Sequence, residues 1–228
     1  PLRKLCDKHN LVLIEDCAQA AGSSVDGLLA GHNSDISVIS FGPMKNIAAL
    51  GDLGVVSTND DSLATQIRLL SQCGVINNEI CIQPSLKHYP DALQAAFLSL
   101  RLTNYQDLLH HRVNLASRYT KQLYGIPRLT VPLINSSSDL SHVFFDYVIS
   151  TPLRDELLTY LYEAQIEAKV RHPLTICSQP SINTSCQSPC SNAVRLVSTS
   201  LCLPIHFNLS ASQIDLVCTA ITKFFAEY

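Results

Sequence analysis

The amino-acid sequence predicts an α/β fold in which strands and helices alternate around a mainly parallel sheet. Three short apolar runs, at residues 11–14, 36–41 and 54–58, have the length and composition of strands that are buried on both faces. Segments with helical periodicity accompany them, each with an apolar stripe on one side. This alternation is typical of parallel α/β structure.

The sequence changes in character after Gly125, where a Gly-Ile-Pro break follows a long helical pattern. Beyond this break, strand and helix patterns are mixed and no longer alternate, which indicates a separate α+β domain. We therefore expect two domains, one over residues 1–125 and a smaller one over residues 126–228.

Four helical patterns are expected in the first part. Asn59 or Asp60 can cap the second of them with its side chain, and Gly74 lies just past its end. The others cover residues 1–10, 90–100 and about 103–123. In the second part we expect strands at 129–133, 143–150 and 201–204, and helices at 152–164 (capped by Thr151), near 193–198 and about 210–225.

The composition excludes several classes of partner. The chain has 228 residues, of which 46% are hydrophobic and 15% charged, with a net charge of −3. That charge creates no strong field to attract nucleic acid or an anionic membrane surface. No apolar run approaches the roughly 20 residues that a membrane helix requires, and no signal peptide pattern is visible at the start. We expect a cytoplasmic protein that binds neither nucleic acid nor membrane.

The nine cysteines have no regular spacing. Several lie inside apolar periodic segments, and the simplest interpretation is buried free thiols in a reducing compartment: Cys17, Cys73, Cys202 and Cys218. A second group, Cys177, Cys186 and Cys190, lacks the close Cys-x-x-Cys pairs or nearby histidines that a metal centre needs. We expect no metal site.

Polar residues that could hold a cofactor follow the first two predicted strands. Asp16 closes the first strand, Gln19 comes three residues later, and Ser40 and Lys45 end and follow the second. Ligands of open α/β sheets bind outside the carboxyl ends of strands. A carboxylate, an amide donor and an amine suit the ring nitrogen, ring oxygen and aldehyde of pyridoxal phosphate. Each residue alone also has a simpler interpretation as a helix cap, a loop residue or a surface lysine.

Their order and spacing resemble the DegT/DnrJ/EryC1/StrS family of sugar aminotransferases. The matching segments are LVLIEDCAQAAG, SFGPMKN, GDLGVVSTND, DALQAAFL and LCLPI, at residues 11–22, 40–46, 51–60, 91–98 and 201–205. The resemblance implies the fold of type I pyridoxal-phosphate transferases, here the C-terminal portion of the cofactor-binding large domain and the small C-terminal domain. It also implies transfer of an amino group, with glutamate as the expected donor, to a nucleotide-linked keto sugar. Aminosugar and surface polysaccharide biosynthesis, and a homodimer, are expected with it.

The resemblance assigns a role to each candidate residue. Asp16 matches the acid that pairs with the pyridine nitrogen, and Gln19 matches the residue beside the ring hydroxyl. Ser40 matches a phosphate contact, and Lys45 matches the catalytic lysine that binds the cofactor covalently. Lys87 stands where the family has an asparagine that reaches the phosphate of the neighbouring subunit, and it could serve that phosphate as a point charge.

The chain also departs from the family pattern. Tyr89 stands where the family has arginine, and Arg171-His172-Pro173 replaces a His-Tyr-Pro motif. The front half of the large domain, which supplies most of the phosphate cradle, precedes the match in the family. An alternative is therefore a catalytically incomplete fragment or a non-catalytic partner subunit of the same fold. A sugar dehydratase is disfavoured, because those relatives usually have histidine where this chain has Lys45.

Overall fold

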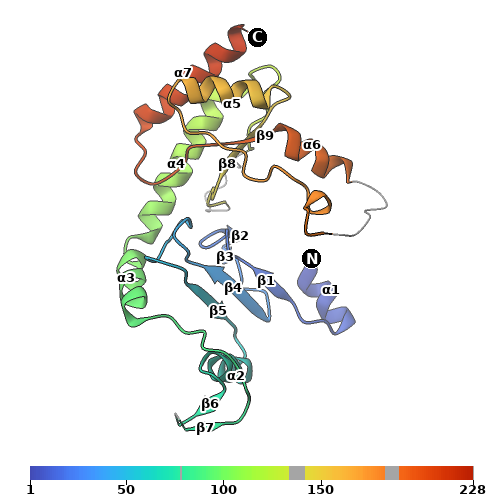
Figure 1. Ribbon diagram of the computed structural model, residues 1–228, viewed down its shortest axis with the longest axis vertical. Helices are drawn as coiled ribbons and strands as arrows, with labels where there is room; N and C mark the ends of the chain where they lie inside the picture. Colours follow the sequence, from blue (N-terminus) through green and yellow to red (C-terminus); the bar gives the residue numbers. More distant parts are fainter. Residues whose placement is uncertain (78, 134–141, 183–189, 228) are drawn as a thin grey trace. The chain divides into compact units, whose positions relative to one another are not determined.

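The computed structural model describes residues 1–77, 79–133, 142–182 and 190–227, which form two compact units (Figure 1). The first unit comprises residues 1–110 and 138–145, and the second comprises residues 111–137 and 146–228. The boundary therefore falls within helix α4, Tyr105–Leu123. The division between residues 125 and 126 expected from the sequence stays a prediction about domains.

A sheet of strands β1 (Ile14–Asp16), β4 (Ile36–Ser40) and β5 (Gly54–Ser57) forms the centre of the first unit, in the order β1-β4-β5 within its described residues. Strands β1 and β4 are parallel, as expected. Strand β5 is antiparallel to β4, so the expectation of parallel character was wrong for the third strand. The chain returns from β4 to β5 through a loop without a crossover helix, and such a return favours antiparallel pairing.

Strand β1 begins later than predicted and is exposed. The carboxylate of Asp35 accepts a hydrogen bond from the backbone N–H of Leu13 at 2.7 Å, and the ladder with β4 starts only after that residue. Most of residues 11–14, which were predicted to form a strand, therefore precede β1 and lie outside the ladder. Ile14 is 63% exposed, because β1 is an edge strand of the described sheet, which corrects the expectation of burial on both faces.

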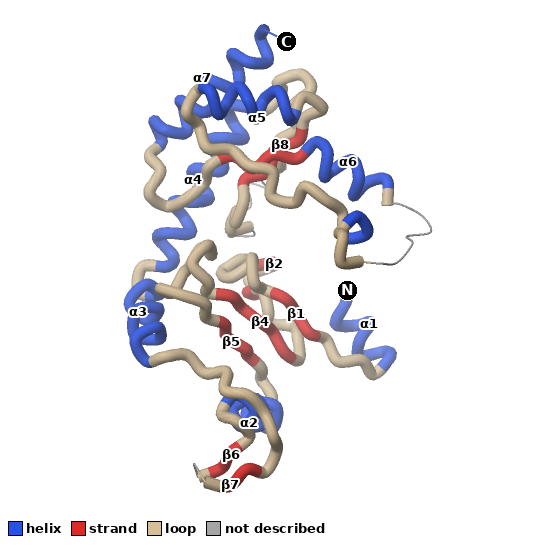
Figure 2. Tube along the Cα trace, viewed as in Figure 1, coloured by secondary structure: helices blue, strands red, loops and turns tan. Residues whose placement is uncertain are grey.

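Helices and two short hairpins complete the first unit (Figure 2). Asp60 caps α2 as one of the two predicted candidates, since its carboxylate accepts from the backbone N–H groups of Ser62 and Leu63. Phe41, Ile47 and Leu98 form a buried cluster beside the sheet. The helices are α1 (Leu2–His9), α2 (Asp61–Ser71) and α3 (Ala92–Leu102), and the hairpins pair β2 (Ser24–Val25) with β3 (Leu28–Leu29) and β6 (Val75–Ile76) with β7 (Ile80–Cys81).

The second unit packs helices against an antiparallel pair of strands. Tyr119 of α4 stacks on Tyr147 of β8 with ring centroids 4.8 Å apart, and both side chains are fully buried. This core also contains Leu157 from the helix over residues 154–163 and Ile214 and Phe224 from the last helix of the chain. The elements are β8 (Tyr147–Ser150), α5 (Arg154–Glu163), a 3-10 turn η1 (Ile176–Ser178), α6 (Ser191–Thr199), β9 (Ser200–Leu203) and α7 (Ala211–Glu227).

Three predictions for the second unit needed correction. The expected strand at residues 129–133 is a single bridge between Thr130 and Ser150, because Pro132 has no N–H to extend the pairing. The strand expected over residues 143–150 begins only at Tyr147. Thr151 does not cap α5 directly: its hydroxyl accepts from the backbone N–H of Leu153, which itself precedes the helix.

The cysteines divide by environment. Cys17, Cys202 and Cys218 are buried free thiols, as predicted. Cys73 is exposed, because it follows the end of α2 instead of facing the core, and the prediction of burial was wrong there. Cys177 is disulfide-bonded, which the expectation of free thiols did not include. Within the described ranges, no helix is long and apolar enough to cross a membrane, and no cluster of ligand side chains could hold a metal ion.

Candidate active site

The candidate site lies where the parallel strands β1 and β4 end. Asp16 is the last residue of β1 and pairs in register with Val38, so Ser40, the last residue of β4, lies two residues further along the same edge. One oxygen of the Asp16 carboxylate accepts from the backbone N–H of Ala18 at 2.9 Å. The side chain is otherwise exposed. The parallel register therefore explains why these two polar residues meet at one edge of the sheet.

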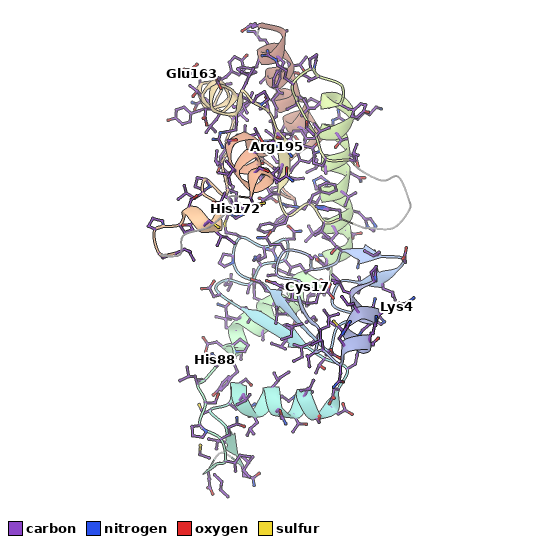
Figure 3. All side chains as sticks on the ribbon, turned by 90° about the vertical axis from the view of Figure 1, so that its right-hand side faces the viewer. Lys4, Cys17, His88, Glu163, His172 and Arg195 are labelled. Atoms are coloured by element: carbon purple, nitrogen blue, oxygen red, sulfur yellow. The ribbon has the colours of Figure 1, made fainter. Side chains whose placement is uncertain are left out.

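Gln19 is carried by a tight turn that follows β1. The backbone N–H of Cys17 continues the ladder to Val38 at 2.8 Å, and the chain then turns back on itself. The hydroxyl of Tyr105, at the start of α4, donates to the carbonyl of Ala21. Burial raises the pKa of Tyr105 to about 12, so the phenol keeps the proton that it donates. Figure 3 labels Cys17 beside the sheet at the root of this turn.

Gly22 lets the turn approach α4 closely. Its φ of +85° is in the left-handed region that favours glycine. A Cβ at this position would lie 2.4 Å from Cδ1 of Leu109 and 2.6 Å from the hydroxyl oxygen of Tyr105. Side chains of α4 thus fix the backbone that presents Gln19.

Lys45 lies in the loop that follows β4. Its backbone N–H donates to the carbonyl of Gly42 at 3.0 Å, which closes a turn, and the nearby Ile47 anchors the loop in the buried cluster. The ammonium nitrogen of Lys45 lies 5.0 Å from the ring centroid of Phe145, a cation–π contact. Phe145 is itself buried, so the aromatic ring covers one side of the amine.

Two amide side chains hold the same loop. Nδ2 of Asn46 donates to the carbonyl of Val143 at 3.2 Å, which ties the loop to the segment that carries Phe145. Oε1 of Gln94, from α3, accepts from the backbone N–H groups of Leu50 and Gly51 at 2.9 and 3.2 Å. The lysine loop is therefore held at Asn46 and at Leu50 and Gly51 by contacts with residues distant in the sequence.

These elements enclose a small pocket. Three of the predicted site residues, Gln19, Ser40 and Lys45, line it together. Asp16 lies at the same sheet edge but is not part of the lining. The remaining lining residues are Ala18, Ala21, Asn46, Ile47 and Phe145.

Lys87 is placed elsewhere in the first unit. It forms an isolated antiparallel bridge with Gln72, just after α2, and its ammonium nitrogen lies 4.7 Å from the ring centroid of Tyr89. The neighbouring His88 is labelled in Figure 3, near the segment that leads to the β6–β7 hairpin. Lys87 is exposed and does not line the pocket of Lys45.

Sequence reasoning missed the residues that position the site. Gln94 lies in a segment that matched the family, but nothing in the sequence showed which backbone groups it binds. Phe145 was placed in a predicted strand, and its contact with Lys45 spans 100 positions of sequence. Tyr105 carried no signal beyond its place at the start of a helix. Only the folded chain brings these side chains to the loops that they hold.

The fold is that of pyridoxal-phosphate-dependent aminotransferases. The structure superimposes on that of DesV from S. venezuelae with a TM-score of 0.92 and 29% identity, covering 98% of this chain and 60% of that one. The model of the DegT/DnrJ/EryC1/StrS aminotransferase family matches residues 1–222, and the chain belongs to that family. Members of this family depend on pyridoxal phosphate, so the cofactor expected from the sequence is confirmed.

Two curated relatives indicate the range of functions in the family. The chain is 33% identical over 223 residues to the erythromycin biosynthesis sensory transduction protein EryC1 of Saccharopolyspora erythraea, covering 96% of this chain and 60% of that protein. It is 36% identical over 177 residues to a dTDP-3-amino-3,4,6-trideoxy-alpha-D-glucose transaminase of Micromonospora megalomicea, covering 75% and 47% respectively. The chain thus spans about 60% or less of the length of these relatives.

The residues present fit the cofactor chemically. An amine, a hydroxyl, an amide and a carboxylate lie at the carboxyl ends of two parallel strands. In this order, the four groups suit the aldehyde, the phosphate, the ring oxygen and the ring nitrogen of pyridoxal phosphate. Oδ1 of Asn46, in the pocket lining, is buried without a hydrogen-bond partner among the described residues. A buried acceptor of this kind is costly unless a ligand or water satisfies it.

Proposed function

We propose that this protein is a pyridoxal-phosphate-dependent aminotransferase that transfers an amino group, with glutamate as the expected donor, to a nucleotide-linked keto sugar in aminosugar or polysaccharide biosynthesis. The observation that carries the proposal is the shared pocket of Gln19, Ser40 and Lys45, beside the carboxylate of Asp16. The transaminase relative supports the substrate class, because its name specifies an amino sugar linked to a nucleotide. We further propose a cytoplasmic homodimer.

Each residue has a distinct task in this proposal. The Lys45 amine would bind the cofactor covalently and, once released, would act as general base and acid at the substrate carbon that bears nitrogen. The Asp16 carboxylate would hold a proton on the ring nitrogen, and Gln19 would donate to the ring oxygen. When bound, pyridoxal phosphate supplies the electron sink that lets a C–H bond next to nitrogen ionise.

The environment of Lys45 supports its role. The Phe145 ring covers one side of the amine, while the contacts of Gln94 and Asn46 hold the loop that carries Lys45. We propose that the Ser40 hydroxyl donates to the cofactor phosphate. Lys87 does not line the pocket of its own subunit, so its proposed phosphate contact would be made across the dimer to the partner's site.

Covalent labelling tests the assignment of Lys45. The chain is incubated with pyridoxal phosphate, reduced with borohydride and digested, and the pyridoxyl group is located by mass spectrometry. We expect the label on Lys45 and its loss in Lys45→Arg. The matched control Lys121→Arg changes an exposed lysine of α4 and should label normally. A label on a different lysine contradicts the assignment, and no label at all supports the alternative of a non-catalytic subunit.

A further inference from the structure

Two exposed cysteines lie at the base of the β6–β7 hairpin. Cys81 is the last residue of β7, and Cys73 lies two residues before β6. Both are free and exposed. The Sγ atom of Cys81 lies 3.9 Å from the carbonyl oxygen of Cys73, so one thiol already contacts the backbone of the other cysteine. Figure 1 shows this hairpin next to α2.

The backbone at Gly74, next to Cys73, lies very close to the backbone of residues 82 and 83, next to Cys81. The carbonyl of Gly74 accepts from the N–H groups of both Ile82 and Gln83, at 3.0 and 3.3 Å. A Cβ at Gly74 would lie 1.4 Å from the carbonyl oxygen of Gln83, so only a glycine can occupy this crossing. Because Gly74 binds residues 82 and 83 and Val75 pairs with Cys81, contacts of the main chain hold the backbone of Cys73 close to Cys81.

A disulfide between these residues requires their two Cβ atoms to come within about 3.5–4.5 Å of each other. Cys73 precedes the β6–β7 ladder and has a φ of +62°, so closure requires this residue and the short hairpin to adjust. Strands β6 and β7 have two residues each, and such a short hairpin has little stability of its own to resist the change.

The buried thiols of the chain are less suited to disulfide formation than this exposed pair. Burial raises the pKa of Cys17 to about 11 and that of Cys218 to about 12, which keeps both in the unreactive thiol form. Burial also raises the pKa of Cys202. Exposure and a neighbouring thiol distinguish the hairpin pair from these three.

We propose that Cys73 and Cys81 are a redox-active thiol pair that closes to an intrachain disulfide in the presence of an oxidised low-molecular-weight disulfide such as oxidised glutathione. One cysteine thiolate attacks a sulfur of the reagent and releases one glutathione thiol. The second cysteine thiolate attacks the resulting mixed disulfide and releases the other. The two cysteine protons end on the two released thiols, so the cysteines are oxidised and the reagent is reduced.

The disulfide would restrain the segment that carries Lys87. The hydroxyl of Ser85 donates to the carbonyl of Leu70 at 2.7 Å, and the N–H of His88 donates to the carbonyl of Ser71 at 2.9 Å. This segment therefore runs along the chain that leads into Cys73. Any consequence for the cofactor phosphate rests on the proposed function, whereas formation of the disulfide does not.

Peptide mapping tests the pair directly. Trypsin cuts after Arg68 and Lys87, so one peptide of residues 69–87 contains both cysteines and no other. The purified chain is treated with oxidised glutathione, alkylated and digested. We expect this peptide to resist alkylation and to weigh two hydrogens less than its reduced form. Cleavage at Glu79, which lies between the cysteines, should leave the fragments joined until a reductant is added.

Substitutions separate the pair from general thiol reactivity. Cys81→Ser should leave Cys73 as a glutathione adduct, while the control Cys190→Ser, at another exposed thiol, should leave the disulfide intact. Amide exchange over residues 82–88 should slow on oxidation, on the order of tenfold, in the parent but not in Cys81→Ser. Full alkylation of both cysteines after the oxidant, or adducts that never resolve to a disulfide, would overturn the proposal.

Discussion

Replacing Gly22 by alanine should strain the turn that presents Gln19. The residue combines a positive φ with a crowded environment, and the two effects can be separated. An alanine in the left-handed region costs about 1–2 kcal/mol. The new methyl group would also overlap Cδ1 of Leu109, which is 1% exposed and cannot move aside freely. Overpacking of this kind costs about 1–3 kcal/mol, so the total is about 2–5 kcal/mol.

Gly27 provides a matched control for the backbone part of this cost. Its φ of +77° is similar, but a Cβ there would meet nothing within 4 Å. Gly27→Ala should therefore lose only about 1–2 kcal/mol. Urea unfolding of the two variants and the parent measures both values. Equal destabilisation by the two substitutions would refute the packing argument, and a neutral Gly22→Ala would refute the close approach of α4 to the turn.

Two further predictions concern the elements around the site. Hydrogen bonds from Ser62 and Leu63 lower the pKa of Asp60 below its usual value, so its cap stabilises α2 above about pH 4 and the stabilisation is lost as the pH falls through the lowered pKa. Asp60→Ala should be less stable than the parent in thermal unfolding at pH 7, and the difference in stability should shrink as the pH falls through the lowered pKa; a difference that stays constant with pH would contradict the cap. Gln94→Ala should destabilise the chain by about 1–2 kcal/mol and expose the amides of Leu50 and Gly51 to exchange, whereas Gln94→Glu, which keeps the acceptor, should restore protection.

The sequence predicted well what depends on local pattern. The positions of most helices, a cap of α2 at either Asn59 or Asp60, and the order Asp16, Gln19, Ser40 and Lys45 along two strand ends all follow from periodicity and spacing. The pairing of segments that lie far apart in the sequence was harder to predict. The antiparallel direction of β5 depends on the path of one loop, and the start of β1 depends on a hydrogen bond from Leu13 to Asp35, 22 positions away.

The supporting contacts of the site could not be read from the sequence for the same reason. Gln94, Tyr105 and Phe145 act on loops that lie 43, 84 and 100 positions away. Each is a common residue in an ordinary helical or strand-like pattern, and its role exists only once the chain is folded. The exposure of Cys73 likewise depends on where α2 ends, which an apolar periodicity locates only to within a few residues.

The contact between Lys45 and Phe145 sets an order of events during synthesis. Residues 138–145 belong to the first unit, although residues 111–137, which precede them, belong to the second. When the ribosome has released the chain only as far as residue 125, Lys45, Ser40 and Gln19 are present. The ring that covers the amine and the carbonyl of Val143 that binds Asn46 are not yet made. The Lys45 amine thus receives its aromatic cover late, and a gene cut after residue 125 would encode Lys45 without the ring that covers its amine.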